Sequence, residues 1–217
     1  MTGRLLCPVQ GLKMEIKILG SSPWILSAAL SAVCLLAALC FGELIDFGCL
    51  ASEVLFPFFT AIAVGEWGKT RADANYEVIA AQCGSLFAWV VKRWLAVWCL
   101  LCLFIIPNLA VCWFIRRESP LWELFILYFP TAFLLSTLAA LAGLLRTEEH
   151  TASLACGLVW LGSLMLRSLL RIPGVAFFYL FTRFADVPGH IWLYSKGVLC
   201  ILGLCLWLLI WKICKRN

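Results

Sequence analysis

The residues in this sequence that could support catalysis are few. The chain has two histidines, His150 and His190, and only His150 follows acidic residues, Glu148 and Glu149. This group resembles acidic motifs of intramembrane proteases, but the chain has no second histidine within an apolar segment. Neither an HExxH zinc motif nor a GxSxG nucleophile motif occurs. The sequence therefore provides no catalytic residue, and an intramembrane hydrolase is the least favoured function.

Cysteine is the next candidate for chemistry, because the chain contains 12 cysteines. Cys99 and Cys102 have CxxC spacing but lie in the middle of an apolar run, without a second pair or a nearby histidine. Eight cysteines lie within apolar runs, where cysteine behaves as a small hydrophobic residue: Cys34, Cys40, Cys99, Cys102, Cys112, Cys156, Cys200 and Cys205. We expect no metal site and no disulfide scaffold.

Charged side chains inside apolar segments are the third set of candidates. Glu53, Glu123 and Arg167 lie within runs that are otherwise hydrophobic, and such residues in membrane proteins often have a functional role. A Glu–Arg pair between two helices is one interpretation. The other is that Glu123 and Arg167 lie near the ends of their segments and extend their charged groups to the surface.

Composition indicates which elements must position these residues. Of the 217 residues, 64% are hydrophobic and 13% are charged, whereas a soluble domain has roughly 45–50% apolar and 25% charged residues. The net charge of +5 does not indicate nucleic-acid binding, because the basic residues cluster at the ends of apolar runs. We expect an all-α integral membrane protein with one transmembrane domain, residues 1–217.

Six apolar segments approach the roughly 20 residues that a helix needs to cross a bilayer. They are 23–41, 47–65, 94–115, 121–145, 152–170 and 191–211. Backbone groups in lipid must be hydrogen-bonded internally, so all six are predicted to be helices. Pro57, Pro107 and Pro130 interrupt three of them, and are expected to form either kinks for packing or hinges.

The distribution of Lys and Arg predicts the orientation. Placing both termini in the cytoplasm puts 11 of the 17 Lys and Arg residues on that side, as the positive-inside rule expects. The short turn after the first span carries only Glu43 and Asp46, which suits the outer face. We expect a multi-pass protein of the cytoplasmic membrane.

The connection between the second and third spans, residues 66–93, is the most polar internal stretch. It carries seven charged residues: Glu66, Lys69, Arg71, Asp73, Glu77, Lys92 and Arg93. No proline interrupts it, and residues 72–81 favour a helix by propensity. It is predicted to be a helical elbow on the membrane surface, and a solvated loop is the alternative. We call residues 66–93 the charged elbow.

Two further segments are neither spans nor short turns. Residues 8–20 have apolar residues at helical spacing beside Lys13 and Lys17, which is typical of an interfacial helix, although the KMEIKI stretch also alternates like a strand. The connection 171–196 contains an apolar run, 175–181, that is too short to span. We expect one or two short helices that enter the outer leaflet there, with a plain amphipathic loop as the alternative.

Together these features resemble the permease subunit of type-2 ATP-binding-cassette exporters, over almost the whole chain. The matching motif is an acid at the end of the second span, a polar Gly/Thr turn, an acid before an apolar helical run, and a small residue and a lysine before the third span. In this sequence those positions are Glu66, Gly68-Lys69-Thr70, Glu77-Val-Ile-Ala, Ser85 and Lys92. The sequence differs from the family at Gln82-Cys83-Gly84, where arginine and proline are usual.

The resemblance implies a cytoplasmic coupling helix between spans two and three, and re-entrant helices between spans five and six. It also implies that separate ATPase subunits, carrying ATP and Mg²⁺, dock on the elbow of this non-catalytic chain. A second permease chain, the same or different, would complete a path for a peptide, a lipid-like molecule or another hydrophobic compound. The implied coupling residues are Glu66, Lys69, Thr70, Arg71, Asp73 and Glu77. The alternative function is that of a polytopic immunity, sensor or scaffold protein without an ATPase.

Overall fold

The structure is a computed structural model that describes most of the chain from Leu50 to Arg216. The described residues are 32, 36, 50–67, 70–71, 73, 77, 85–116, 120–148, 150–172, 174–185, 187 and 189–216. Every regular element within them is a helix, which confirms the all-helical prediction for this part of the chain. The predicted interfacial helix at 8–20 and the Glu43–Asp46 turn lie outside the described residues. Of the first predicted span, only Ala32 and Leu36 are described, and both are helical.

Five helices in the described residues are long and apolar enough to cross a membrane, which fits a multi-pass membrane protein. Six spans were predicted, and five are described. The elements are a π-helix, η1 (Leu50–Leu55), that continues into α4 (Phe56–Trp67); α6 (Leu86–Arg116); α7 (Leu121–Leu145); α8 (Thr151–Met165), followed by the 3₁₀-helix η2 (Leu166–Arg171); and α10 (Ile191–Arg216). A four-residue helix, α9 (Val175–Phe178), lies between η2 and α10.

The observed helix ends differ from the predicted ones where charge was taken as a boundary. Helix α7 has the predicted bounds, because Pro120 precedes it and the extended backbone of Arg146 follows it. Helix α6 begins at Leu86, eight residues before the predicted start of the third span at Trp94. Lys92 and Arg93 do not interrupt it, because both residues are good helix formers.

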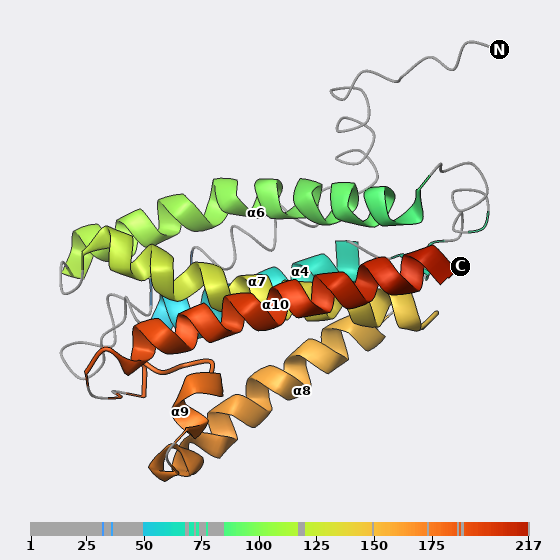
Figure 1. The fold of residues 1–217 in the computed structure, drawn as a ribbon. Helices are drawn as coiled ribbons and strands as arrows, with labels where there is room; N and C mark the ends of the chain where they lie inside the picture. Colours follow the sequence, from blue (N-terminus) through green and yellow to red (C-terminus); the bar gives the residue numbers. More distant parts are fainter. Residues whose placement is uncertain are drawn as a thin grey trace.

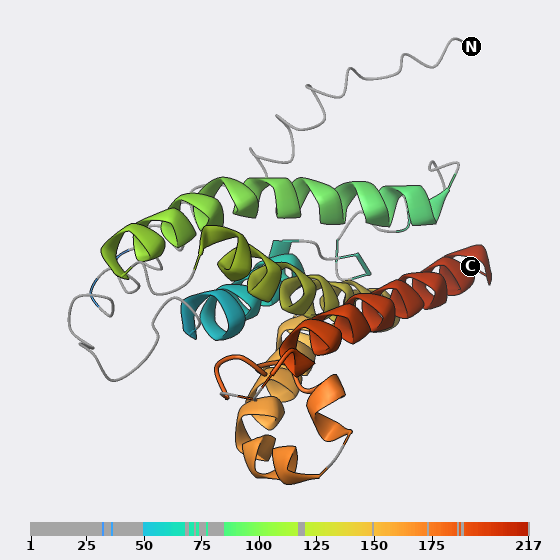
Figure 2. The ribbon, with the colours of Figure 1, turned by 60° about the vertical axis from the view of Figure 1, so that its left-hand side comes forward.

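Helix α7 lies at the centre of the bundle. It packs against η1 and α4, α6, α8 and α10, and Figures 1 and 2 show α6 along one side of the bundle and α8 with α9 along the other. Small and hydroxyl-bearing residues on α7, including Thr131, Ala132 and Ser136, are fully buried. Such residues let membrane helices approach closely and form hydrogen bonds between them. An example is the 2.9 Å hydrogen bond between Thr60 Oγ1 on α4 and the Tyr128 hydroxyl.

Helices α8 and α10 face outward with large apolar side chains. Leu158 and Met165 on α8 are 69% and 72% exposed, and Leu208 on α10 is 63% exposed. In water such a surface would be unfavourable. An exposed apolar surface on two helices fits a multi-pass membrane protein.

One side-chain oxygen on α7 holds α6 in place. The indole Nε1 atoms of Trp94 and Trp98, one turn apart on α6, donate to the hydroxyl oxygen of Ser136 at 3.3 and 2.8 Å. The Ser136 hydroxyl donates in turn to the Phe133 carbonyl at 3.1 Å. Both indoles are almost fully buried, so their N–H groups are hydrogen-bonded within the apolar interface as burial requires.

The π-helix η1 brings a polar residue into the bundle. Its wider turns run over Leu50–Leu55 and end just before Pro57, which lacks a backbone N–H. The Val54 carbonyl accepts a 2.9 Å hydrogen bond from Trp160 Nε1 on α8. Short π-helical turns occur often at functional sites, and this one carries the fully buried Glu53.

Candidate functional site

Charged side chains gather at two places in the described structure. The first is where α4 ends and α6 begins, close to the turn between α7 and α8. The second is inside the bundle near the beginning of α10. We call them the elbow cluster (Glu66, Arg71, Asp73, Arg93 and His150) and the buried cluster (Glu53 and Lys196, with Thr131).

In the elbow cluster, Glu66 connects α4 to α8. Its Oε1 accepts a 2.7 Å hydrogen bond from Ser153 Oγ and lies 3.1 Å from His150 Nδ1. Gly65 permits this contact, because a Cβ atom built there would lie 2.9 Å from Ser153 Oγ and 3.1 Å from Ser153 N. The second predicted span therefore ends fixed to the beginning of the fifth.

The elbow itself is attached to two other helices. The backbone N–H of Arg71 donates to the Gly143 carbonyl of α7 at 3.2 Å. Asp73 Oδ2 forms a 2.7 Å ion pair with Arg93 Nη1 on α6, and the Arg93 guanidinium also lies over the Trp89 ring, 5.1 Å from its centroid. The described part of the elbow, which begins at the end of α4, thus contacts α6, α7 and α8.

Of the predicted coupling residues, the structure brings Glu66, Arg71 and Asp73 into this cluster. Thr70 is buried beside them, and Glu77 is helical and exposed. Lys69 lies outside the described residues. Thr70, Arg71 and Asp73 are not helical, so the elbow begins as a turn, and the predicted coupling helix over 72–81 is described only at Asp73 and Glu77.

The buried cluster is an ion pair closed off from the surface. Lys196 Nζ on α10 lies 2.6 Å from Glu53 Oε1 on η1, and the two side chains are 2% and 0% exposed. Lys196 Nζ also donates to Thr131 Oγ1 on α7 at 2.8 Å and to the Leu180 carbonyl at 2.7 Å. All three protons of the ammonium group therefore have acceptors.

Glu53 binds the backbone of the segment between α9 and α10. Its Oε2 accepts from the Phe184 N–H at 2.7 Å, and its Oε1 accepts from the Arg183 N–H at 3.3 Å and from Thr182 Oγ1 at 3.5 Å. We call residues 179–185 the inner loop. It has no helix or strand, yet Tyr179, Leu180, Phe181 and Thr182 are all buried.

The other two intramembrane candidates lie at the edge of the inner loop. Glu123 Oε1, near the start of α7, lies 3.2 Å from Arg183 Nε. Arg167 in η2 lies over the Phe184 ring, 5.7 Å from its centroid. A Glu–Arg pair is therefore present, but it joins Glu123 to Arg183 of the inner loop.

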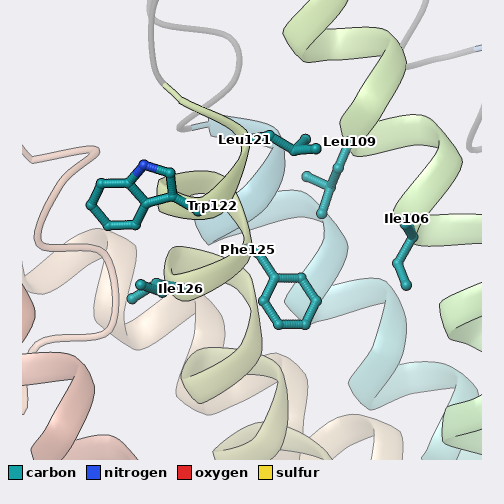
Figure 3. A pocket seen from close by; sticks show the side chains of 6 residues that line it. All are labelled: Ile106, Leu109, Leu121, Trp122, Phe125 and Ile126. Atoms are coloured by element: carbon teal, nitrogen blue, oxygen red, sulfur yellow. The ribbon is translucent and has the colours of Figure 1, made fainter.

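A separate cavity of about 570 Å³ lies between α6 and α7. Figure 3 shows Leu121 and Phe125 of α7 on the side of α6, and Ile106 and Leu109 of α6 beside them. The side chains that line the cavity are aliphatic or aromatic, with Trp122 and Ile126 completing the set. It offers no charged group to orient a ligand.

Sequence analysis identified Glu53 but did not identify Lys196 as its partner. Lys196 lies five residues after the start of an apolar helix, so the rule that flagged Glu53 applies to it equally. The sequence did not predict the burial of residues 179–182, because a short apolar run is equally compatible with a surface loop. Among the described residues, no group of three His, Cys, Asp or Glu side chains could hold a metal ion.

Comparison with known proteins identified no relative of this chain. The chain matches no protein-family model, no curated protein and no solved structure.

Proposed function

We propose that this chain is the permease subunit of an ATP-driven exporter of the type-2 ATP-binding-cassette kind. In this proposal separate ATPase subunits, which carry ATP and Mg²⁺, dock on the charged elbow from the cytoplasm. A second permease chain, the same or different, completes the path across the membrane. The substrate class is a peptide, a lipid-like molecule or another hydrophobic compound.

The observation that carries the proposal is that the described part of the elbow contacts three helices, α6, α7 and α8. Glu66 is bound to Ser153 of α8, Arg71 to Gly143 of α7, and Asp73 to Arg93 of α6. A displacement applied to the elbow would therefore be transmitted to these helices together. A solvated loop that only joins two spans would need none of these contacts.

Charge and exposure support a protein partner at this end of the molecule. Glu77 and His150 are exposed, and the chain has no GxxxxGK[ST] motif with which to bind ATP itself. Polar, charged surfaces at the rim of an interface guide association between proteins. A soluble ATPase with a complementary polar surface fits this end of the bundle.

The test is copurification in mild detergent from the native membrane, with ATP hydrolysis and protein identity measured in the eluate. We expect a nucleotide-hydrolysing subunit to accompany the wild-type protein. Glu77→Lys should reduce its recovery by about tenfold, because a reversed charge at an interface rim costs on the order of 1 kcal/mol or more. The double variant Glu66→Lys/Glu77→Lys should abolish the association.

The matched control is Glu148→Lys, which makes the same charge change on an exposed residue outside the elbow. It should retain the ATPase. If no ATPase accompanies the wild-type protein, or if the double variant exports normally with its ATPase bound, the proposal is wrong. The protein would then be better described as a polytopic immunity, sensor or scaffold protein.

A further inference from the structure

The inner loop is held in the bundle by the apolar packing of Tyr179, Leu180 and Phe181 and by polar contacts to its backbone. The Leu180 carbonyl accepts from Lys196, the Tyr179 carbonyl accepts from Ser195 Oγ at 2.9 Å, and the N–H groups of Arg183 and Phe184 donate to Glu53. Irregular backbone buried among apolar helices needs such partners, because its surroundings offer none. The loop has little regular structure of its own to keep it folded.

These partners belong to three different transmembrane elements. Glu53 is on η1, Thr131 is on α7, and Ser195 and Lys196 are on α10. The loop is thus seated where these elements meet, and the fully buried Phe181 and Thr182 fill the space between them. Any relative movement of α10 and η1 would separate the two charges that hold the loop.

The groups beneath the loop are more polar than the rest of the bundle interior. Glu53, Thr131, Ser195 and Lys196 are each at most 2% exposed with the loop in place. If the loop were lifted, they would line an opening with both a negative and a positive group. Water could replace every backbone contact that the loop now makes with these side chains.

We propose that the inner loop is a plug, and that the Glu53–Lys196 pair is the latch that seats it. In the state described here, the latch is closed and the plug fills the junction of η1, α7 and α10. Separation of α10 from η1 opens the latch, releases the backbone of residues 180–184, and exposes a polar passage at that junction. This inference goes beyond the proposed function and does not depend on an ATPase.

The peripheral contacts of the loop distinguish the latch from a simple surface attachment. Arg183 also pairs with Glu123, and that pair is partly open to the surface, with the arginine side chain 38% exposed. Glu123 contacts a side chain, whereas Glu53 accepts from two backbone N–H groups of the loop. Loss of Glu123 should therefore leave the plug seated.

The experiment is hydrogen–deuterium exchange of the full chain in phosphatidylcholine nanodiscs, read by mass spectrometry on peptides that cover residues 180–187. The principal variant is Glu53→Leu/Lys196→Met, which removes both charges and leaves no unpaired one. We expect the amides of Arg183 and Phe184 to exchange at least about tenfold faster than in the wild type, because their acceptor is gone. Peptides from the centre of α7 should exchange as in the wild type.

The matched control is Glu123→Gln, which should leave exchange in the loop unchanged. If the double variant does not reach the membrane, Glu53→Gln is measured in its place; because glutamine keeps one acceptor oxygen, at least one of the amides of Arg183 and Phe184 should show the acceleration. Unchanged exchange in the loop would overturn the latch. Loss of protection in α7 together with the loop would also overturn it, because the pair would then hold the whole bundle and not a plug.

Discussion

Glu53 and Lys196 are buried charged residues, and each is stable in the bundle only because the other is its counter-ion. Removing an ionised group from water costs several kcal/mol, and only close pairing with further hydrogen bonds offsets this cost. Here the charged atoms are 2.6 Å apart, and both side chains have additional hydrogen-bond partners. The stability of the pair is therefore a property of both residues together.

We predict that Lys196→Met destabilises the protein by about 3–5 kcal/mol, because it leaves the Glu53 carboxylate buried without its counter-ion. Glu53→Leu/Lys196→Met should lie much closer to the wild type, within about 1–2 kcal/mol, because no charge is left unpaired. Thermal unfolding of the two variants in the same detergent measures the difference. Equal melting temperatures for the single and double variants would contradict this account of the pair.

At the scale of elements, the packing of α4 against α8 depends on a close backbone approach at Gly65. A Cβ atom there would lie 2.9 Å from Ser153 Oγ and 3.3 Å from the Ala152 side chain. Ser153 cannot simply turn away, because its hydroxyl donates to Glu66 at 2.7 Å. The end of the second span, its elbow contact and the start of α8 are therefore linked by one small residue.

We expect Gly65→Ala to destabilise the protein by about 1–3 kcal/mol, as overpacking of a close contact does. The matched control is Gly157→Ala on α8, because a Cβ atom at Gly157 meets nothing within 4 Å. That substitution should be neutral, or stabilising by up to about 1 kcal/mol through helix propensity. Unfolding in denaturant distinguishes the two, and a Gly65→Ala protein as stable as Gly157→Ala would show that the helices can separate without cost.

At the scale of the whole molecule, the elbow cluster and the end of α10 lie at the same end of the bundle (Figure 1). The beginning of α10 and the inner loop lie toward the other end. The proposed docking of an ATPase on the elbow therefore requires that the C-terminus lie in the cytoplasm. Lys212, Lys215 and Arg216 near that terminus fit this orientation.

We predict that a green fluorescent protein fused after Asn217 is fluorescent, whereas alkaline phosphatase fused at the same position is inactive. The first folds in the cytoplasm, and the second is active only outside it. Expression of both fusions in the same bacterial strain, with activity normalised to protein amount, is the measurement. The reverse pattern would put the elbow outside the cell and exclude an ATPase partner there.

Local sequence patterns predicted the elements well and the partnerships between them poorly. The apolar run between Pro120 and Arg146 is long and clearly bounded, so α7 was predicted correctly from its own residues. The charged elbow was recognised by its composition, but its contacts with Gly143 and Ser153 depend on where α7 and α8 pack. The same holds for Glu53, whose partner Lys196 is more than 140 positions away in the chain. Such pairs are determined by packing and not by spacing.

The oxygen of Ser136 has a consequence for how the molecule can move. It donates once and accepts twice, which uses the full capacity of a hydroxyl group. Sliding α6 along α7 would move at least one of the two buried indoles away from this shared acceptor. We therefore expect α6 and α7 to move as one rigid pair in any conformational change of the bundle.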